Sequence, residues 1–193
     1  MITSVRNTSI NDSEEKIKKL INIRDRHLNC FEEYENIVKS SSYKLMSKSK
    51  NSSLYGMYMS DDDLVKYFWD KGLKLTKEES KRDFVYYFDD KNQLLLSERY
   101  NANGVRLLSW NFFYYYENYT EIIKYSPEDK RIFRVALINY KNGVLDSFLE
   151  SGYMIKGVVD TYSEYLFNLI SNTVVKKTYS DNLEKTTEIV KLH

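Results

Sequence analysis

Two residues with chemically reactive side chains lie close together near the N-terminus. His27 and Cys30 are three positions apart, so their side chains could touch if the segment is helical. An imidazole beside a thiol is a pair that nucleophilic catalysis uses, because the imidazole can take the thiol proton. The sequence offers no residue to orient the imidazole, and the other histidine, His193, is terminal and expected to be disordered. We therefore interpret His27 as a structural histidine and Cys30 as a buried, inert thiol.

Carboxylates are the second group with chemical potential. The aspartates Asp61–Asp63 follow Ser60 in a pattern like a capping box, which predicts the start of a helix. A metal site would need further ligands that the sequence does not place. Glu98, Asp146 and Glu150 could converge on one sheet face, as a carboxylate-dependent hydrolase would require, but charged residues that alternate with apolar ones usually form the solvated side of a strand. No phosphate-binding glycine loop, nucleophile elbow, zinc spacing or dinucleotide fingerprint occurs. We predict no catalytic residue, no metal and no cofactor, and hence no enzyme.

The third group is an aromatic segment suited to binding. Alternation along a strand would place four rings on one face, with Phe113 and Tyr115 on the other. Because both faces are aromatic, we expect a central strand that packs on helices through one face. Either both faces form core, or one face leaves tyrosines exposed as rigid anchors with a hydroxyl for hydrogen bonding. The candidate binding residues are Trp110, Phe112, Tyr114 and Tyr116.

The elements that would position these residues differ between the two parts of the chain. Residues 1–10 look frayed, and apolar residues then recur at helical intervals and predict a helix from about Asp12 to Val38. Residues 43–59 are ambiguous between strands and an exposed loop, and a second, short helix is expected from Ser60 to Gly72. The predicted strands are rich in aromatic and β-branched residues: Phe84–Phe88, Leu94–Tyr100, Val105–Tyr116, Tyr119–Tyr125, Arg131–Tyr140, Val144–Glu150, Tyr153–Val159, Tyr162–Ile170, Val174–Tyr179 and Thr186–Leu192.

Short polar turns connect these strands, and Asn142-Gly143 is the strongest hairpin signal among them, since a type I′ turn needs positive φ at both central residues. The turns are too short for parallel crossovers, so an up-and-down meander follows. Residues 162–170 could instead be helical, because Tyr162, Leu166 and Ile170 are four residues apart. We predict an α+β fold in which N-terminal helices (1–82) pack on or beside a C-terminal meandering antiparallel β-sheet (83–193), with the two parts forming one cooperative domain.

Several hairpins share one form, an aromatic residue, a polar turn and an apolar residue, as in Tyr140-Lys-Asn-Gly-Val144 and Tyr179-Ser-Asp-Asn-Leu183. The aromatic residue closes one strand and the apolar residue opens the next, and neighbouring hairpins must extend the sheet to bury the unit. This form resembles the tyrosine–aspartate hairpin repeats of bacterial toxin-delivery proteins over roughly residues 84–192.

Composition limits the compartment and the partners. The chain has 193 residues, a net charge of +1 and a single cysteine, and its N-terminus has no long apolar run. We therefore expect a cytoplasmic protein without an export signal or a membrane span. Balanced charge gives no long-range field to attract nucleic acid, which makes nucleic acid an unfavoured partner. The 18 tyrosines suit strands and binding interfaces.

In size, in its Lys/Asn/Tyr-rich composition and in its expected helices and hairpin sheet, the chain resembles the immunity proteins that neutralise bacterial polymorphic toxins. That resemblance implies a non-catalytic protein that occludes a cognate toxin domain, and it transfers no residue role. Two alternatives stay open. One is a sheet module that stacks tyrosines on bases or sugar rings, and the other is a carboxylate-dependent hydrolase.

Overall fold

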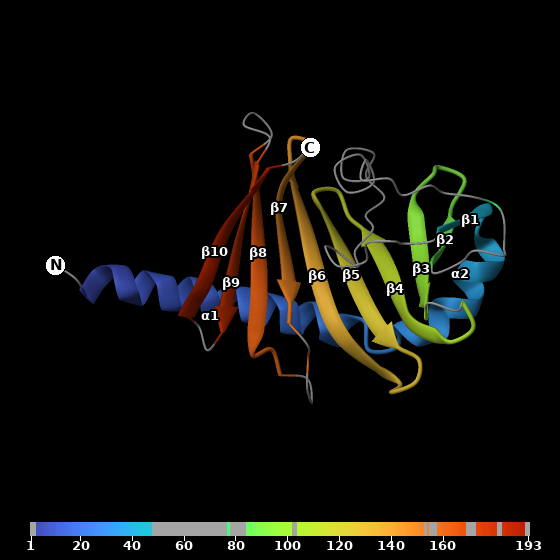
Figure 1. Ribbon diagram of the computed structural model, residues 1–193, viewed down its shortest axis with the longest axis horizontal. Coiled ribbons are helices and arrows are strands. Elements are labelled where there is room, and N and C mark those ends of the chain that lie inside the picture. Colours follow the sequence, from blue (N-terminus) through green and yellow to red (C-terminus); the bar gives the residue numbers. More distant parts are fainter. Residues whose placement is uncertain are drawn as a thin grey trace. The chain divides into compact units, whose positions relative to one another are not determined.

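The computed structural model describes residues 3–47, 77, 84–101, 104–152, 154, 158–168, 173–180 and 183–191, and the statements below concern these residues. The second helix predicted from Ser60, including Asp61–Asp63, lies outside them, as do residues 48–59 and His193. Ten antiparallel strands form one sheet in the order of the chain (Figure 1). They are β1 (Tyr43–Ser47), β2 (Phe84–Phe88), β3 (Leu94–Tyr100), β4 (Leu107–Tyr115), β5 (Tyr119–Ser126), β6 (Arg131–Lys141), β7 (Val144–Ser151), β8 (Thr161–Asn168), β9 (Thr173–Ser180) and β10 (Leu183–Lys191). The predicted α+β fold with an antiparallel meander is confirmed.

The N-terminal helical region differs from the single predicted helix. Helix α1 (Thr3–Arg26) begins well before Asp12, so the prediction that residues 1–10 are frayed is wrong for residues 3–10. The α-helix ends at Arg26, and a 3₁₀ turn, η1 (Cys30–Glu33), leads into the short helix α2 (Tyr34–Ser40). The break contains no proline or glycine. Asn29 lies at φ −100° and ψ 17°, in the bridge region between helical and extended backbone, and so redirects the chain.

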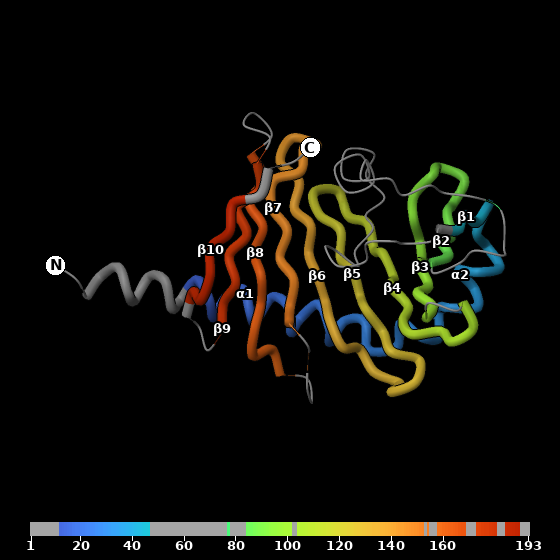
Figure 2. The backbone as a smooth tube through the Cα atoms, in the orientation of Figure 1, coloured from blue at the N-terminus to red at the C-terminus, as the bar shows by residue number. Residues whose placement is uncertain are grey.

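The hairpins follow the turn chemistry that the sequence predicted. Asn142 and Gly143 have φ values of 54° and 73°, as a type I′ turn between β6 and β7 requires. Residues 161–168 form a strand, so the helical alternative for that segment is wrong. The strand predicted over Tyr153–Val159 is also wrong for its described residues, where Val158 makes only an isolated bridge. The tube in Figure 2 shows β8, β9 and β10 running side by side, as the strand order requires.

Contacts divide the chain into two compact units. The first comprises Met1–Leu28, Tyr115–Glu121 and Ile132–Leu192, and α1 packs there against β7 through a face that buries Leu20 and Ile23. Burial of such aliphatic side chains contributes about 1.5–3 kcal/mol each.

The second unit comprises Asn29–Tyr114 and Ile122–Arg131, together with His193. Every residue of β2 is buried, and α2 packs against β3. Strand β1 comes from the N-terminal part of the sequence and pairs with β2, whereas the boundary predicted between residues 82 and 83 falls outside the described residues. In the described ranges no helix is both long and apolar enough to cross a membrane.

Candidate functional site

Four stacked rings join η1, α2, β4 and β5 in the second unit, and we call them the aromatic column. Its members are Phe31, Tyr125, Trp110 and Tyr34, in that order. The ring centroids of Phe31 and Tyr125 are 5.8 Å apart, those of Tyr125 and Trp110 are 5.7 Å apart, and those of Trp110 and Tyr34 are 4.1 Å apart. All three pairs lie within 21° of parallel. Stacked pairs contribute about 0.5–1.5 kcal/mol each beyond the area that they bury, so the column is a rigid element.

Strand β4 supplies three of the four predicted binding residues, and alternation puts them on the side that carries the column. Trp110 is half-buried between Tyr34 and Tyr125, and Phe112 is fully buried, edge-on to Trp110 at 6.2 Å. The half-buried Tyr114 donates its hydroxyl to Glu33 Oε2 at 3.1 Å. Phe113 on the opposite side is also buried, as expected for a central strand.

The fourth predicted residue belongs to the other unit. Tyr116 follows the last residue of β4, belongs to the first unit and is exposed, and its ring stacks on Tyr119 at 4.4 Å. The structure therefore brings together Trp110, Phe112 and Tyr114 but not Tyr116. The role of all four residues in binding stays a prediction.

A buried carboxylate beside the column holds one of its rings in place. Glu98 on β3 is directly opposite Trp110 in the β3–β4 register, so both side chains lie on the same side of the sheet. Tyr34, Tyr87 and Tyr100 all donate their hydroxyls to the Glu98 carboxylate, and the distances from Tyr87 and Tyr100 are 3.1 and 2.8 Å. Burial and the hydrogen bond to Glu98 raise the pKa of Tyr34, which keeps its hydroxyl protonated as a donor.

The outer end of the column is open to solvent and lies among acidic residues. Phe31 is 43% exposed, whereas Tyr125 beneath it is buried. Glu32 and Glu33 follow Phe31 in η1, and Glu35 follows in the first turn of α2. Trp110 has a further feature: its indole N–H is buried and has no hydrogen-bond acceptor among the residues that the structure describes. A buried donor left unpaired costs about 1–3 kcal/mol, so packing of the ring must outweigh that loss.

Sequence reasoning missed most of this site. The helix predicted from Asp12 to Val38 includes Phe31 and Tyr34, and the sequence suggests a role for Glu98 only as a hydrolase carboxylate. The contacts that unite them span 64 residues between Tyr34 and Glu98, and periodicity reports only which residues share a face of one element. The one available signal was the cluster Phe31-Glu-Glu-Tyr34, which combines rings and carboxylates in one turn.

Cys30 and His27 belong to different units, and neither is left without a structural role. Cys30 is a buried free thiol, and burial, with a contribution from Glu33, raises its pKa to about 12. His27 Nε2 lies 2.7 Å from Oε2 of Glu121 on β5, a partner that the sequence did not reveal. Arg26 pairs with the other oxygen of the same carboxylate, whose side chain is only 1% exposed. This cluster attaches the end of α1 to β5 within the first unit.

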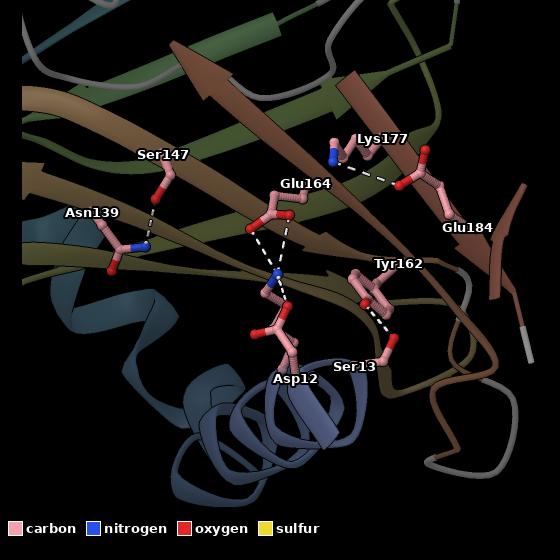
Figure 3. A network of polar contacts seen from close by, with 9 residues as sticks. Asp12, Ser13, Asn139, Ser147, Tyr162, Glu164, Lys177 and Glu184 are labelled. Carbon is pink, nitrogen blue, oxygen red and sulfur yellow. Dashed lines mark hydrogen bonds and ion pairs between the residues drawn. The ribbon is translucent and has the colours of Figure 1, made fainter. Parts of the chain in front are cut away.

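A second polar network attaches the earlier part of α1 to β8 (Figure 3). Lys16 Nζ lies 2.8 Å from Asp12 and 3.0 Å from Glu164. Burial opposes the charge of Lys16, but the hydrogen bonds to these two carboxylates outweigh it and raise the pKa of the ammonium. Ser13 Oγ lies 2.5 Å from the Tyr162 hydroxyl. These contacts are structural, because each polar group is satisfied by a neighbour within the unit.

Among the described residues, no group of three or more His, Cys, Asp or Glu side chains is placed to hold a metal ion. Asp146 is exposed on β7, and Glu150 of the same strand lies 3.5 Å from Arg134. Glu98, the third carboxylate considered for a hydrolase, accepts hydrogen bonds from three tyrosine hydroxyls. Comparisons with protein-family models, curated proteins and solved structures found no match to the chain.

Proposed function

We propose that the protein is a non-catalytic binding protein that neutralises a cognate bacterial toxin domain by covering it, and that the aromatic column is the centre of its binding surface. The observation that supports this proposal is the column itself, a stack of rings with a buried base and a solvent-exposed Phe31 at its end. Exposed aromatic side chains held in one position bind partners without a large loss of rotamer freedom.

The neighbours of the column support a preorganised surface. Tyr34 is fixed at one end by its stack on Trp110 and by its hydrogen bond to Glu98. Phe31 at the other end rests on the buried Tyr125. A ring of this size that becomes fully buried in an interface contributes about 2 kcal/mol or more when it is a hot spot. Phe31 is therefore the residue whose truncation should weaken binding most clearly.

The charges around Phe31 bear on the alternative of a nucleic-acid module. Glu32, Glu33 and Glu35 are all exposed and lie within four residues of Phe31. Binding of nucleic acid needs basic residues that neutralise phosphates, and carboxylates next to a stacking ring repel them. The acidic surroundings thus favour a protein partner over a nucleic acid.

The test is co-expression with toxin domains encoded beside this protein's gene. We expect one of them to arrest growth when expressed alone, and growth to be restored by the wild-type protein with formation of a stable complex. Phe31→Ala should weaken that complex at least tenfold, as measured by calorimetry. Val105→Ala is the matched control, because Val105 is an apolar residue of the same unit that is 82% exposed and lies outside the column.

Two results would contradict the proposal. One is that none of the neighbouring gene products is toxic or forms a complex with the protein. The other is a complex that Phe31→Ala and Val105→Ala weaken equally, because the column would then have no special part in binding. Binding of oligosaccharides in place of protein, detected by the same calorimetry, would favour the sugar-binding alternative.

A further inference from the structure

We propose that the exposed end of the aromatic column receives an arginine side chain from a basic segment of the partner protein. This inference rests on the proposed function and specifies the chemistry of the partner at this site. The guanidinium would lie against the outer face of Phe31, where Glu32 and Glu33 supply carboxylates for its N–H groups.

Charge is the first observation that favours a basic occupant. The segment from Asn29 to Ser40 carries three glutamates and one lysine, so its formal charge is −2. Its lysine, Lys39, is 3.1 Å from Glu35 and so offsets that carboxylate. Glu33 accepts a hydrogen bond from Tyr114, and a carboxylate can accept more than one such bond. Negative charge therefore accumulates at Glu32 and Glu33, next to the exposed ring.

The exposed ring is the second observation. A cation over an aromatic face is attracted by the negative face of the π-system, and arginine makes this contact more often than lysine. Its guanidinium is planar, so it can stack on a ring while its edge donates hydrogen bonds to a carboxylate. Phe31 offers an exposed ring in the residue next to Glu32, so one side chain can satisfy both preferences.

The same two observations disfavour other occupants of this site. A phosphate or an acidic peptide would meet like charge at Glu32 and Glu33. A wholly apolar segment would cover Phe31 but would also desolvate the neighbouring carboxylates without pairing them, which is costly. A segment that carries an arginine covers the Phe31 ring and at the same time pairs its guanidinium with the carboxylates of Glu32 and Glu33.

The test uses short Gly/Ser-rich peptides that carry several arginines, several lysines or several citrullines. Citrulline keeps the shape of arginine but has no charge. Trp110 reports binding by fluorescence in a Trp69→Phe background, which leaves Trp110 as the only tryptophan of the chain. We expect the arginine peptide to bind in a salt-sensitive way, the lysine peptide to bind several-fold more weakly, and the citrulline peptide at least tenfold more weakly.

Variants locate the contact. Phe31→Ala and Glu32→Lys should each weaken binding of the arginine peptide by about tenfold. Asp90→Lys changes the net charge by the same amount at an exposed position between β2 and β3, and it should change the affinity less than twofold. Equal binding of the arginine and citrulline peptides, no binding at millimolar peptide, or equal effects of Glu32→Lys and Asp90→Lys would overturn the inference.

The inference and the proposed function fail in different ways. If a toxin domain is neutralised and Glu32→Lys leaves its affinity unchanged, the function stands and the arginine site is wrong. If the peptides discriminate as expected and no toxin domain is bound, the site recognises arginine and the proposed function is wrong.

Discussion

The Glu98 carboxylate offers the sharpest test of how the second unit is held together. Replacing Glu98 by Ala removes the acceptor of three tyrosine hydroxyls at once. Tyr87 is buried, so the loss of its hydrogen bond to Glu98 should cost about 2 kcal/mol, whereas the half-buried Tyr34 and Tyr100 can turn toward water and should cost about 1 kcal/mol each. We therefore expect Glu98→Ala to lower the free energy of unfolding by about 4 kcal/mol.

The assay is equilibrium unfolding in urea, followed by Trp110 fluorescence in the Trp69→Phe background. Glu128→Ala is the control, because Glu128 also pairs with a neighbour, Arg106, but is exposed, and its loss should cost about 0.5 kcal/mol or less. A loss below about 1 kcal/mol for Glu98→Ala would refute the reasoning, because the three hydroxyls would then have found other partners.

Three further predictions concern single side chains. Lys16→Met should destabilise the protein by about 2 kcal/mol in urea unfolding, because it leaves the largely buried Glu164 without its ion pair. Lys39→Met removes an exposed helical pair and should cost about 0.5 kcal/mol or less. Equal losses of stability for the two variants would contradict this prediction. Cys30 should react with a thiol reagent at pH 8 about 10³-fold more slowly than a free cysteine, because its pKa is raised from 9.0 to about 12. A fast reaction at pH 8 would show that the thiol is not buried. Because the pKa of Cys30 is raised in the folded protein, the thiol also contributes stability that is complete below pH 9 and is lost as the pH rises through about 12. Trp110→Phe should lower the free energy of unfolding by only about 1 kcal/mol, since the indole N–H makes no hydrogen bond to any described residue. A loss above about 3 kcal/mol would contradict this and reveal a further partner of the N–H.

The sequence predicted the sheet well because local signals determine it. The bounds of β2 and β3 match the predicted ranges, and the Asn142-Gly143 turn has the backbone that its two residues favour. Apolar composition misled over Tyr153–Val159, where the described residues form no strand beyond the isolated bridge at Val158. Gly152 and Thr161 flank this segment and approach closely, because the Gly152 N–H donates to the Thr161 carbonyl at 2.6 Å and a Cβ on Gly152 would clash with the Thr161 side chain. Such a close approach of two segments is set by tertiary contact and has no signal in periodicity.

The site was harder to predict than the fold because its parts come from different elements. The sequence correctly placed Trp110, Phe112 and Tyr114 in one strand, but it could not show which rings stack across from Trp110. Phe31 also follows the helical apolar pattern, yet it is 43% exposed because the α-helix ends at Arg26 and the chain continues as a 3₁₀ turn. The exposed ring of the proposed binding surface thus follows a regular helical pattern that the backbone does not keep.

The break after Arg26 links the fold to the proposed function. An unbroken helix would carry Phe31 on the apolar face that includes Leu20, which is fully buried. The turn at Asn29 instead brings Phe31 over Tyr125 and Tyr34 over Trp110, and Glu98 then fixes the Tyr34 hydroxyl. The entropy of ordering these rings is therefore lost during folding and not during binding, which is the condition under which a small exposed aromatic area can bind a partner tightly. A helix break that exposes one ring while the column beneath it stays packed is a structural reason to place the binding surface at Phe31.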